Sequence, residues 1–360
     1  MNIKSLLLGS AVASVAFTGA QAADAIFVPE PEPMEYVRVC DVYGAGFFYI
    51  PGTETCLKIG GYVRYQIDFD EDHFGESEGF RKFGRAQLTV DARSETELGT
   101  LRSFAELWFS QHANYGEVWN PEGIYSNNNN SLNVRQAFIE LGGLFVGIKT
   151  TLWDGALAGE YDNFGYDSRV HTIGYNFAAA NGINVALALE EYDFNYDYTP
   201  NVVGKVGIKQ GWGTVNLFAA YDATAEEWAA KAIAAIKLSD PLTLELGAAY
   251  ASGASWYSPK ISNLPGTVFG AFGAESYEWS LGAHLKYAVN EKLALGIGGQ
   301  YWADNHLTGF NDWSIGAVAD YEVVKGFATK LAINYYDGDT FDATGLDGHW
   351  GGFLRLQRSF

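Results

Sequence analysis

The sequence predicts an all-β fold, a transmembrane antiparallel β-barrel of sixteen strands with short periplasmic turns and long extracellular loops. Three observations predict it: an export signal at the N-terminus, segments of about ten residues in which apolar and polar residues alternate, and a regular alternation of short and long connections. Composition agrees with this fold. The chain has 42 Gly, 23 Phe, 22 Tyr and 10 Trp, and its mean hydropathy of −0.07 is what an apolar exterior and a polar interior give on average.

Residues 1–22 have the organisation of a cleaved signal peptide. Lys4 supplies the positive charge, residues 6–17 form a short apolar stretch, and Ala20-Gln21-Ala22 matches the A-x-A cleavage pattern. We therefore expect the mature chain to begin near residue 23. No later stretch approaches the roughly 18 to 20 uninterrupted apolar residues of a membrane helix, so the sequence excludes a helical membrane protein.

The balance of charge and the two cysteines restrict the partners of the chain. Removal of residues 1–22 leaves 43 acidic and 22 basic side chains, a net charge of −21, and this disfavours nucleic acid as a partner. Cys40 and Cys56 would enter an oxidising compartment, where a disulfide between them is expected. Two free buried thiols are the alternative. Two cysteines without nearby histidines fall short of a zinc site, and we expect no metal and no cofactor.

Residues 23–56 are expected to form a periplasmic lead-in to the barrel. The alternating proline and glutamate at 29–33 cannot join a sheet and favour an extended chain. Two short apolar runs follow, at 36–40 and 46–50. Because the cysteines flank them, these runs predict a small hairpin stapled by the disulfide.

From residue 57 onward the sequence has the period of two that a membrane-spanning strand requires. In residues 62–69, one face carries Val63 and Tyr65 whereas the other carries Arg64 and Gln66. The same pattern recurs with aromatic residues at outward positions near the strand ends, as in the interfacial girdles of membrane barrels. The clearest repeats are 242–250, 279–287, 293–301 and 313–321.

The connections between these segments fall into two alternating classes. Short turns are predicted at 95–98, 142–143, 179–182, 210–213, 239–241, 290–291 and 324–326. Longer polar loops are predicted at 70–81, 111–132, 151–169, 191–201, 222–226, 252–276, 304–311 and 338–347. These connections join sixteen strands over residues 57–360, an even number as in bacterial single-chain barrels.

Residues 226–238 are rich in alanine and would form a helix on propensity alone. We predict a strand, because the segment has the length of a strand and precedes the turn at Asp240 and Pro241. Trp228, Ala230 and Ala232 would then share one face. A helix lying in the membrane interface is the alternative for this segment.

Several short motifs resemble the alphaproteobacterial family of general diffusion porins, and the resemblance extends over essentially the whole chain. They are YVRVC at 36–40, IPGTETC at 50–56, GYVR at 61–64, SETELG at 94–99, GWG at 211–213 and QRSF at 357–360. The resemblance implies a homotrimer in the cell outer membrane, in contact with its lipid and lipopolysaccharide, that lets small hydrophilic solutes diffuse passively. The terminal Phe360 resembles the signal read by the barrel-assembly machinery, although Arg358 departs from the usual apolar residue.

The resemblance also indicates where a pore constriction would lie, because in such porins the third long loop folds into the barrel. Residues 151–169 are the positional match. Their acidic side chains Asp154, Glu160, Asp162 and Asp167 lie among glycines that would let the backbone turn inward. An ordinary solvated surface loop is the alternative.

A basic wall is predicted opposite this loop. Strand parity places Arg64, Arg85, Arg93 and Arg102 on the lumenal face, since an arginine facing lipid costs about 2 to 4 kcal/mol at mid-membrane. Arg135 is a further candidate whose strand fits either register. Small outward residues on the early strands and the closing strand suggest a trimer interface, namely Gly61, Ser103, Ala105 and Gly352.

The predicted function is therefore a water-filled channel with a weak preference for cations, set by the acidic net charge. A sugar-selective pore is an alternative, because Tyr161, Phe164 and Tyr166 could form an aromatic path or could brace the loop. A phospholipase-like enzyme is less favoured. The six histidines accompany no nucleophile elbow and no pair at metal spacing, so the chain is not expected to be an enzyme; they are His73, His112, His171, His284, His306 and His349.

Overall fold

The computed structural model describes residues 38–71, 79–113, 119–120, 123–124, 128–165, 168–178, 181–192, 199–261 and 275–360. The chain divides into two units, Met1–Val37 and Arg38–Phe360, and only the second is described below. The predicted signal peptide and the proline-rich stretch lie outside the described residues.

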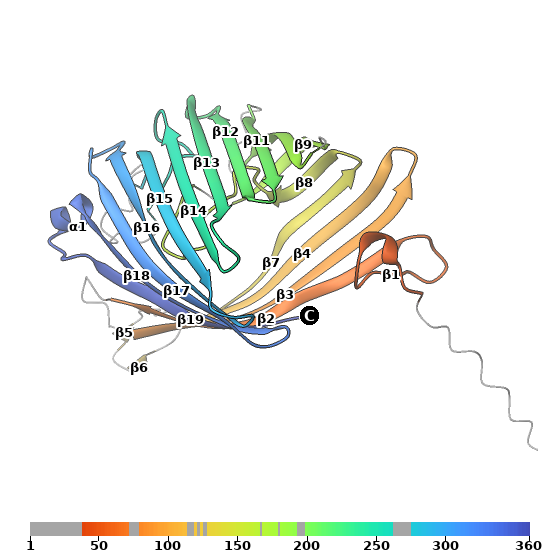
Figure 1. The fold of residues 1–360 in the computed structure, drawn as a ribbon, viewed down its shortest axis with the longest axis horizontal. Coiled ribbons are helices and arrows are strands. Elements are labelled where there is room, and N and C mark those ends of the chain that lie inside the picture. The colour runs from red at the N-terminus through yellow and green to blue at the C-terminus, as the bar shows by residue number, and fades with distance from the viewer. Residues whose placement is uncertain are drawn as a thin grey trace, which may run out of the picture. The chain divides into compact units, whose positions relative to one another are not determined.

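Sixteen strands of the described chain form one closed antiparallel barrel, as the sequence predicted (Figure 1). Each strand pairs with the next, and the last strand pairs with the first over Gly351↔Asp70 to Ser359↔Tyr62, which closes the sheet. The strands are β2 (Cys56–Asp70), β3 (Gly79–Thr96), β4 (Gly99–Ala113), β7 (Asn128–Leu141), β8 (Leu144–Thr150), β9 (Arg169–Ala178), β10 (Ile183–Glu191), β11 (Asn201–Gln210), β12 (Gly213–Asp222), β13 (Glu227–Lys237), β14 (Leu242–Ala251), β15 (Tyr277–Ala288), β16 (Leu293–Asn305), β17 (Asp312–Val324), β18 (Phe327–Gly338) and β19 (His349–Ser359).

The connections alternate between short and long as predicted, with one exception: the predicted loop at 222–226 is a turn at 223–226, no longer than the turn at 238–241. The barrel thus has a short-turn end and a long-loop end. Two loops hold structure that the sequence did not indicate. A small hairpin of β5 (Trp119–Asn120) and β6 (Gly123–Ile124) lies between β4 and β7, and a short helix α1 (Asp339–Thr344) lies between β18 and β19. Among the described residues, no helix is long and apolar enough to cross a membrane.

The alanine-rich segment forms strand β13, as predicted, and not an interfacial helix. It pairs with β12 on one side and with β14 on the other. Both neighbours satisfy its backbone hydrogen bonds, and this outweighs the helical propensity of alanine. Trp228 lies exposed on the outer face, whereas Lys231 and Ile233 are buried on the inner face.

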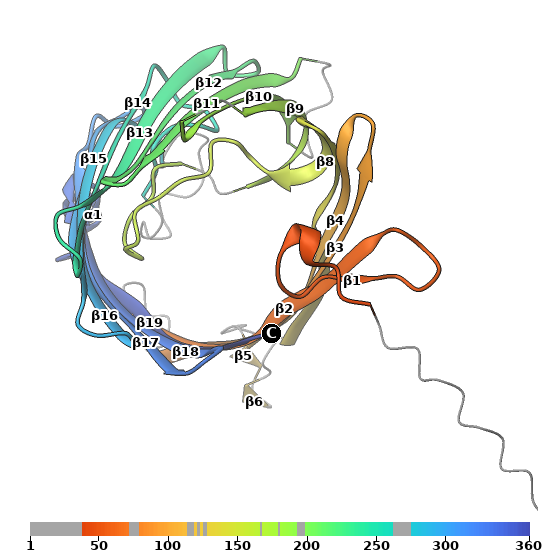
Figure 2. The same ribbon diagram turned by 45° about the vertical axis from the view of Figure 1, so that its right-hand side comes forward.

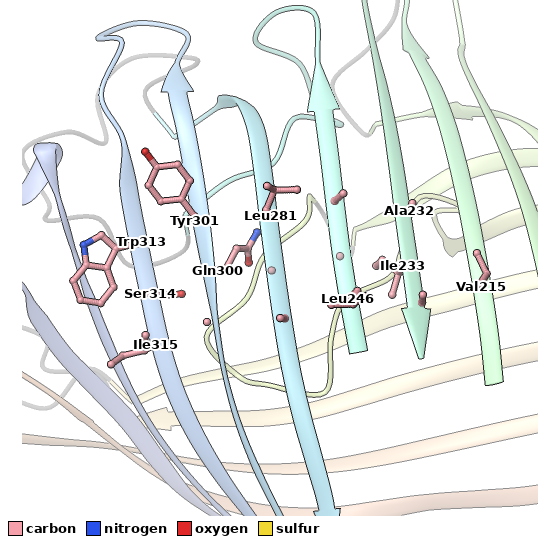
Figure 3. Close-up of a pocket in the computed structure, with 16 residues that line it drawn as sticks. Val215, Ala232, Ile233, Leu246, Leu281, Gln300, Tyr301, Trp313, Ser314 and Ile315 are labelled. Carbon is pink, nitrogen blue, oxygen red and sulfur yellow. The ribbon is translucent and has the colours of Figure 1, made fainter. Parts of the chain in front are cut away.

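The outer face of the barrel is apolar, with aromatic side chains near the long-loop end of several strands. Tyr250 lies between Trp228 and Trp279, with ring centroids 5.0 and 4.5 Å away. A pocket of about 750 Å³ lies over β12 to β17. Tyr301 and Trp313 lie there beside much smaller residues (Figure 3). Large exposed apolar side chains on strands fit contact with lipid.

The segment before the barrel is tied to its first strand by the predicted disulfide between Cys40 and Cys56. It contains a short 3-10 helix, η2 (Asp41–Tyr43), and a two-residue strand, β1 (Phe48–Tyr49), which pairs with the start of β2. The Tyr43 hydroxyl donates a 2.6 Å hydrogen bond to Glu95 at the end of β3. The segment therefore packs at the short-turn end of the barrel.

Candidate functional site: an inner loop and a basic wall

The described residues 151–165 of the connection between β8 and β9 lie inside the barrel, and we call them the inner loop (Figure 2). It begins against a buried carboxylate on β10. Glu190, only 1 % exposed, accepts hydrogen bonds from the Thr151 hydroxyl at 2.6 Å and from the Leu152 backbone N–H at 2.7 Å. These two donors satisfy the oxygens of a charge that would otherwise be costly to bury.

A lysine on β13 holds the next turn of the inner loop. Lys231 is 3 % exposed, and its Nζ donates to the carbonyls of Trp153 at 2.6 Å and Gly155 at 3.1 Å. Further along, the Ala158 N–H donates to Glu245 on β14 at 2.6 Å. The barrel wall thus supplies charged partners for the loop backbone at three successive places.

Two aromatic rings of the inner loop pack into depressions that wall glycines leave open. Phe164 lies over Gly247 on β14, where a Cβ atom would come within 2.4 Å of the ring. Tyr161 lies over Gly316 on β17, where a Cβ atom would come within 2.6 Å. Both rings are 2 % exposed or less, so they brace the loop and do not line a path for solutes. Tyr166 lies outside the described residues.

The tip of the inner loop reaches β18 and β19. Glu160 forms an ion pair with Lys330 at 2.8 Å and lies 3.7 Å from Arg355, and its carbonyl accepts a hydrogen bond from Asn334. The loop therefore extends along the wall from β10 to β19. Glu160 also interacts electrostatically with Arg64 on β2, so the tip lies near the predicted basic wall.

The other predicted acidic residues of the loop have different surroundings. Asp154 is exposed and interacts electrostatically with Lys205 and Lys231. Asp162 accepts a hydrogen bond from the Leu157 N–H at 2.7 Å, and its Oδ1 atom is buried without a partner among the described residues. Burial raises the pKa of Asp162 to about 7. Asp162 therefore acts as an internal brace of the loop. Asp167 lies outside the described residues.

Arg93 and Arg102 form what we call the closed arginine pair. They lie opposite each other on β3 and β4, and the carboxylate of Asp91 bridges them. Arg93 donates to both Asp91 oxygens at 2.9 and 2.7 Å, and Arg102 donates to the same oxygens at 3.0 and 2.9 Å. Arg102 also pairs with Glu140 at 2.9 Å. This pair lies near the short-turn end, and its charge is balanced within the wall.

Arg64 and Arg85 form what we call the open arginine pair. They also lie opposite each other, on β2 and β3, but their hydrogen bonds go to neutral groups. Arg64 donates to the Gln357 side-chain oxygen at 2.9 and 2.7 Å, and Arg85 donates to the Ser110 hydroxyl at 3.1 Å. Within the described part of the chain, neither guanidinium has a carboxylate at ion-pair distance.

The wall contains three further cations, Lys330, Arg355 and Arg135, whose positions the sequence did not fully predict. Lys330 and Arg355 were missed, although Arg355 alternates with the outward-facing Leu354 and so had a detectable signal. Arg135 lies at a break in register between β4 and β7, and this irregularity explains why its strand fitted two registers. Its guanidinium lies 4.0 Å from the Trp108 ring centroid. Trp108 is also 3.6 Å from the Arg85 guanidinium, so Arg135 extends the basic wall.

A closed antiparallel barrel with an apolar outer face, a polar lumen and a loop folded inside has the architecture of an outer-membrane channel. The chain belongs to the Porin subfamily, whose family model matches residues 24–352. It is 39 % identical to porin Omp2b from Brucella canis and from Brucella abortus, over the full length of both chains. The comparisons therefore indicate an outer-membrane porin channel and not an enzyme.

Solved structures share the fold at low sequence identity. The outer-membrane channel DcaP of Acinetobacter baumannii superposes with a TM-score of 0.63 at 15 % identity, covering 87 % of this chain and 99 % of DcaP. A variant of the Rhodopseudomonas blastica porin superposes with a TM-score of 0.56 at 16 % identity, covering 84 % of this chain and all of that porin. Both comparisons support the barrel fold.

Proposed function

We propose that this porin lets small hydrophilic solutes diffuse passively through a constriction between the inner loop and the basic wall. The observation that carries this proposal is the position of Glu160, which pairs with Lys330 near Arg64. The aqueous path would pass between this tip and the wall of β2 and β3. A sugar-selective path is less well supported, because Tyr161 and Phe164 are packed against wall glycines.

Single-channel conductance in planar lipid bilayers tests this proposal. Purified protein should give stepwise, ohmic conductance in KCl, and added maltose should lower it only slightly. Replacing the wall residue Gly316 by valine should displace Tyr161 and alter the conductance, because the side chain would occupy the place of the ring. A protein that folds but conducts no ions would refute the proposed function, and strong saturable block by maltose would favour a sugar-selective pore.

We propose that ion selectivity is weak and favours cations. The support is the excess of acidic residues after removal of residues 1–22, 43 against 22 basic ones, which would favour cations throughout the lumen. Mobile ions screen the field of these charges beyond about 8 to 10 Å at near-physiological salt. The preference should therefore fade as the KCl concentration rises.

We also propose, from the sequence, how the chain is exported, how it assembles and what it contacts. Residues 1–22 would be removed as a signal peptide, residues 23–56 would lie in the periplasm, and Phe360 would be read by the barrel-assembly machinery. A homotrimer would form through Gly61, Ser103, Ala105 and Gly352. The remaining apolar outer face would contact outer-membrane lipid and lipopolysaccharide.

A further inference from the structure

We propose that the open arginine pair binds the carboxylate of a small solute in the lumen, between Arg64, which leans toward β19, and Arg85, which leans toward β4. This inference rests on the proposed channel function and names a class of solute for it, namely small organic molecules that carry a carboxylate. The binding residues are Arg64 and Arg85. Arg355 adds positive charge beside them.

The closed pair gives the internal precedent. Both pairs consist of two arginines that lie directly opposite each other on neighbouring strands, an arrangement in which like charges repel. In the closed pair the two oxygens of Asp91 each accept hydrogen bonds from both guanidinium groups. The protein itself therefore contains the geometry in which one carboxylate satisfies two facing arginines.

The open pair has the same charges without the carboxylate. Arg64 interacts electrostatically with both Arg85 and Arg355, so three positive groups influence one part of the lumen. Glu160, the carboxylate that acts on Arg64, already pairs with Lys330 and lies 3.7 Å from Arg355. A carboxylate entering from solution would relieve repulsion that no described side chain of the wall relieves.

The guanidinium N–H groups of Arg64 and Arg85 that make no hydrogen bond to the described chain are suited to the two oxygens of a carboxylate. Arg85 uses Nε for Ser110 and lies 3.6 Å from the Trp108 ring centroid, a contact that fixes the plane of its guanidinium. Arg64 uses Nε and Nη2 for Gln357. The terminal nitrogens of Arg85 and Nη1 of Arg64 are thus left for a ligand, and guanidinium groups match the two oxygens of a carboxylate.

Current block by glutarate tests the site in the full-length protein reconstituted in planar bilayers. In dilute KCl, glutarate should lower the wild-type conductance, whereas glutaramide, which has the same length and no charge, should not. Arg64→Gln and Arg85→Gln should each raise the glutarate concentration for half-block about tenfold, since a hydrogen bond to a charged group is lost. Arg93→Gln, the matched change in the closed pair, should leave it unchanged.

Three results would overturn the inference: glutarate has no effect on a conducting wild-type channel, both open-pair variants are blocked as readily as the wild type, or Arg93→Gln weakens the block equally. Each variant reports its own folding through its KCl conductance, and if one does not fold the other gives the same test. Wild-type protein that conducts no ions would refute the channel function as well. Conduction without any glutarate effect would refute this inference alone.

Discussion

The closed and open arginine pairs differ in the hydrogen-bond partners of their guanidinium groups: the closed pair shares one carboxylate, whereas each arginine of the open pair bonds to a separate neutral side chain. Both pairs involve strand β3, both face the lumen, and both bring two positive charges together across neighbouring strands. Asp91 bridges the pair near the short-turn end, and Glu140 supplies the second negative charge through its ion pair with Arg102. Glutamine and serine accept hydrogen bonds from the pair near the loop tip. A balanced pair stabilises the wall. An unbalanced pair leaves charge available to whatever passes through the lumen.

The largest effect is expected from opening the closed pair. Asp91→Asn would leave Arg93 and Arg102 facing each other, and because the carboxylate is largely buried, the free energy of unfolding should fall by about 2 to 3 kcal/mol. Denaturant unfolding in lipid vesicles, followed by tryptophan fluorescence, measures this free energy of unfolding. As a control, Glu54→Gln breaks an exposed ion pair with Arg38 and should cost less than about 0.5 kcal/mol. Equal losses in the two variants would contradict the distinction between the pairs.

Closing the open pair should have a smaller effect of opposite sign. Gln357→Glu places a carboxylate where Arg64 already donates two hydrogen bonds, so it should raise the free energy of unfolding by about 0.5 to 1 kcal/mol. It should also weaken glutarate block, because the new carboxylate would form an ion pair with the Arg64 guanidinium that the ligand needs. The same unfolding and conductance measurements apply. A variant that is blocked by glutarate as strongly as the wild type would show that Arg64 does not hold the ligand.

A further effect is confined to the inner loop beside the open pair and depends on pH. Burial raises the pKa of Asp162 to about 7, from 3.8 in the unfolded chain, so the docked loop favours the protonated carboxyl. Its stability should be greatest below pH 4 and should decrease as the pH rises to about 7. Amide hydrogen exchange of residues 151–165, corrected for the intrinsic rate, should show this decrease in the wild type. Asp162→Asn should remove it, and a wild-type profile that does not vary with pH would contradict the assignment.

Much of the barrel could be predicted because its physical constraints are periodic. Membrane strands alternate outward and inward residues, so the strands, their connections and the lumenal side of Arg64, Arg85, Arg93 and Arg102 follow from parity. Even the alanine-rich segment that forms β13 follows the two-residue period of a strand, although its composition favours a helix. The short helix α1 escaped prediction because a six-residue element in a loop leaves no periodic signal.

The arrangement within the lumen could be predicted only in part, because pairings between distant strands leave no mark in one sequence. Parity predicted four inward arginines but did not predict that Asp91 would bridge two of them. The same limit applies to Asp162, which looks like its neighbour Glu160 in the sequence but folds back onto the Leu157 backbone. The sequence contains Gly316 and Gly247 within predicted strands. Only the folded inner loop shows that these glycines make room for the rings of Tyr161 and Phe164.

Reversal potentials in a KCl gradient test the central claim, that the open pair borders the constriction whereas the closed pair does not. Arg85→Gln and Arg93→Gln each remove one positive charge from β3, eight residues or about 26 Å apart along the strand. We predict that Arg85→Gln raises the ratio of potassium to chloride permeability about twofold, since one charge at a narrow point is little screened, and that Arg93→Gln changes it much less. Equal shifts, or a larger shift in Arg93→Gln, would contradict the account.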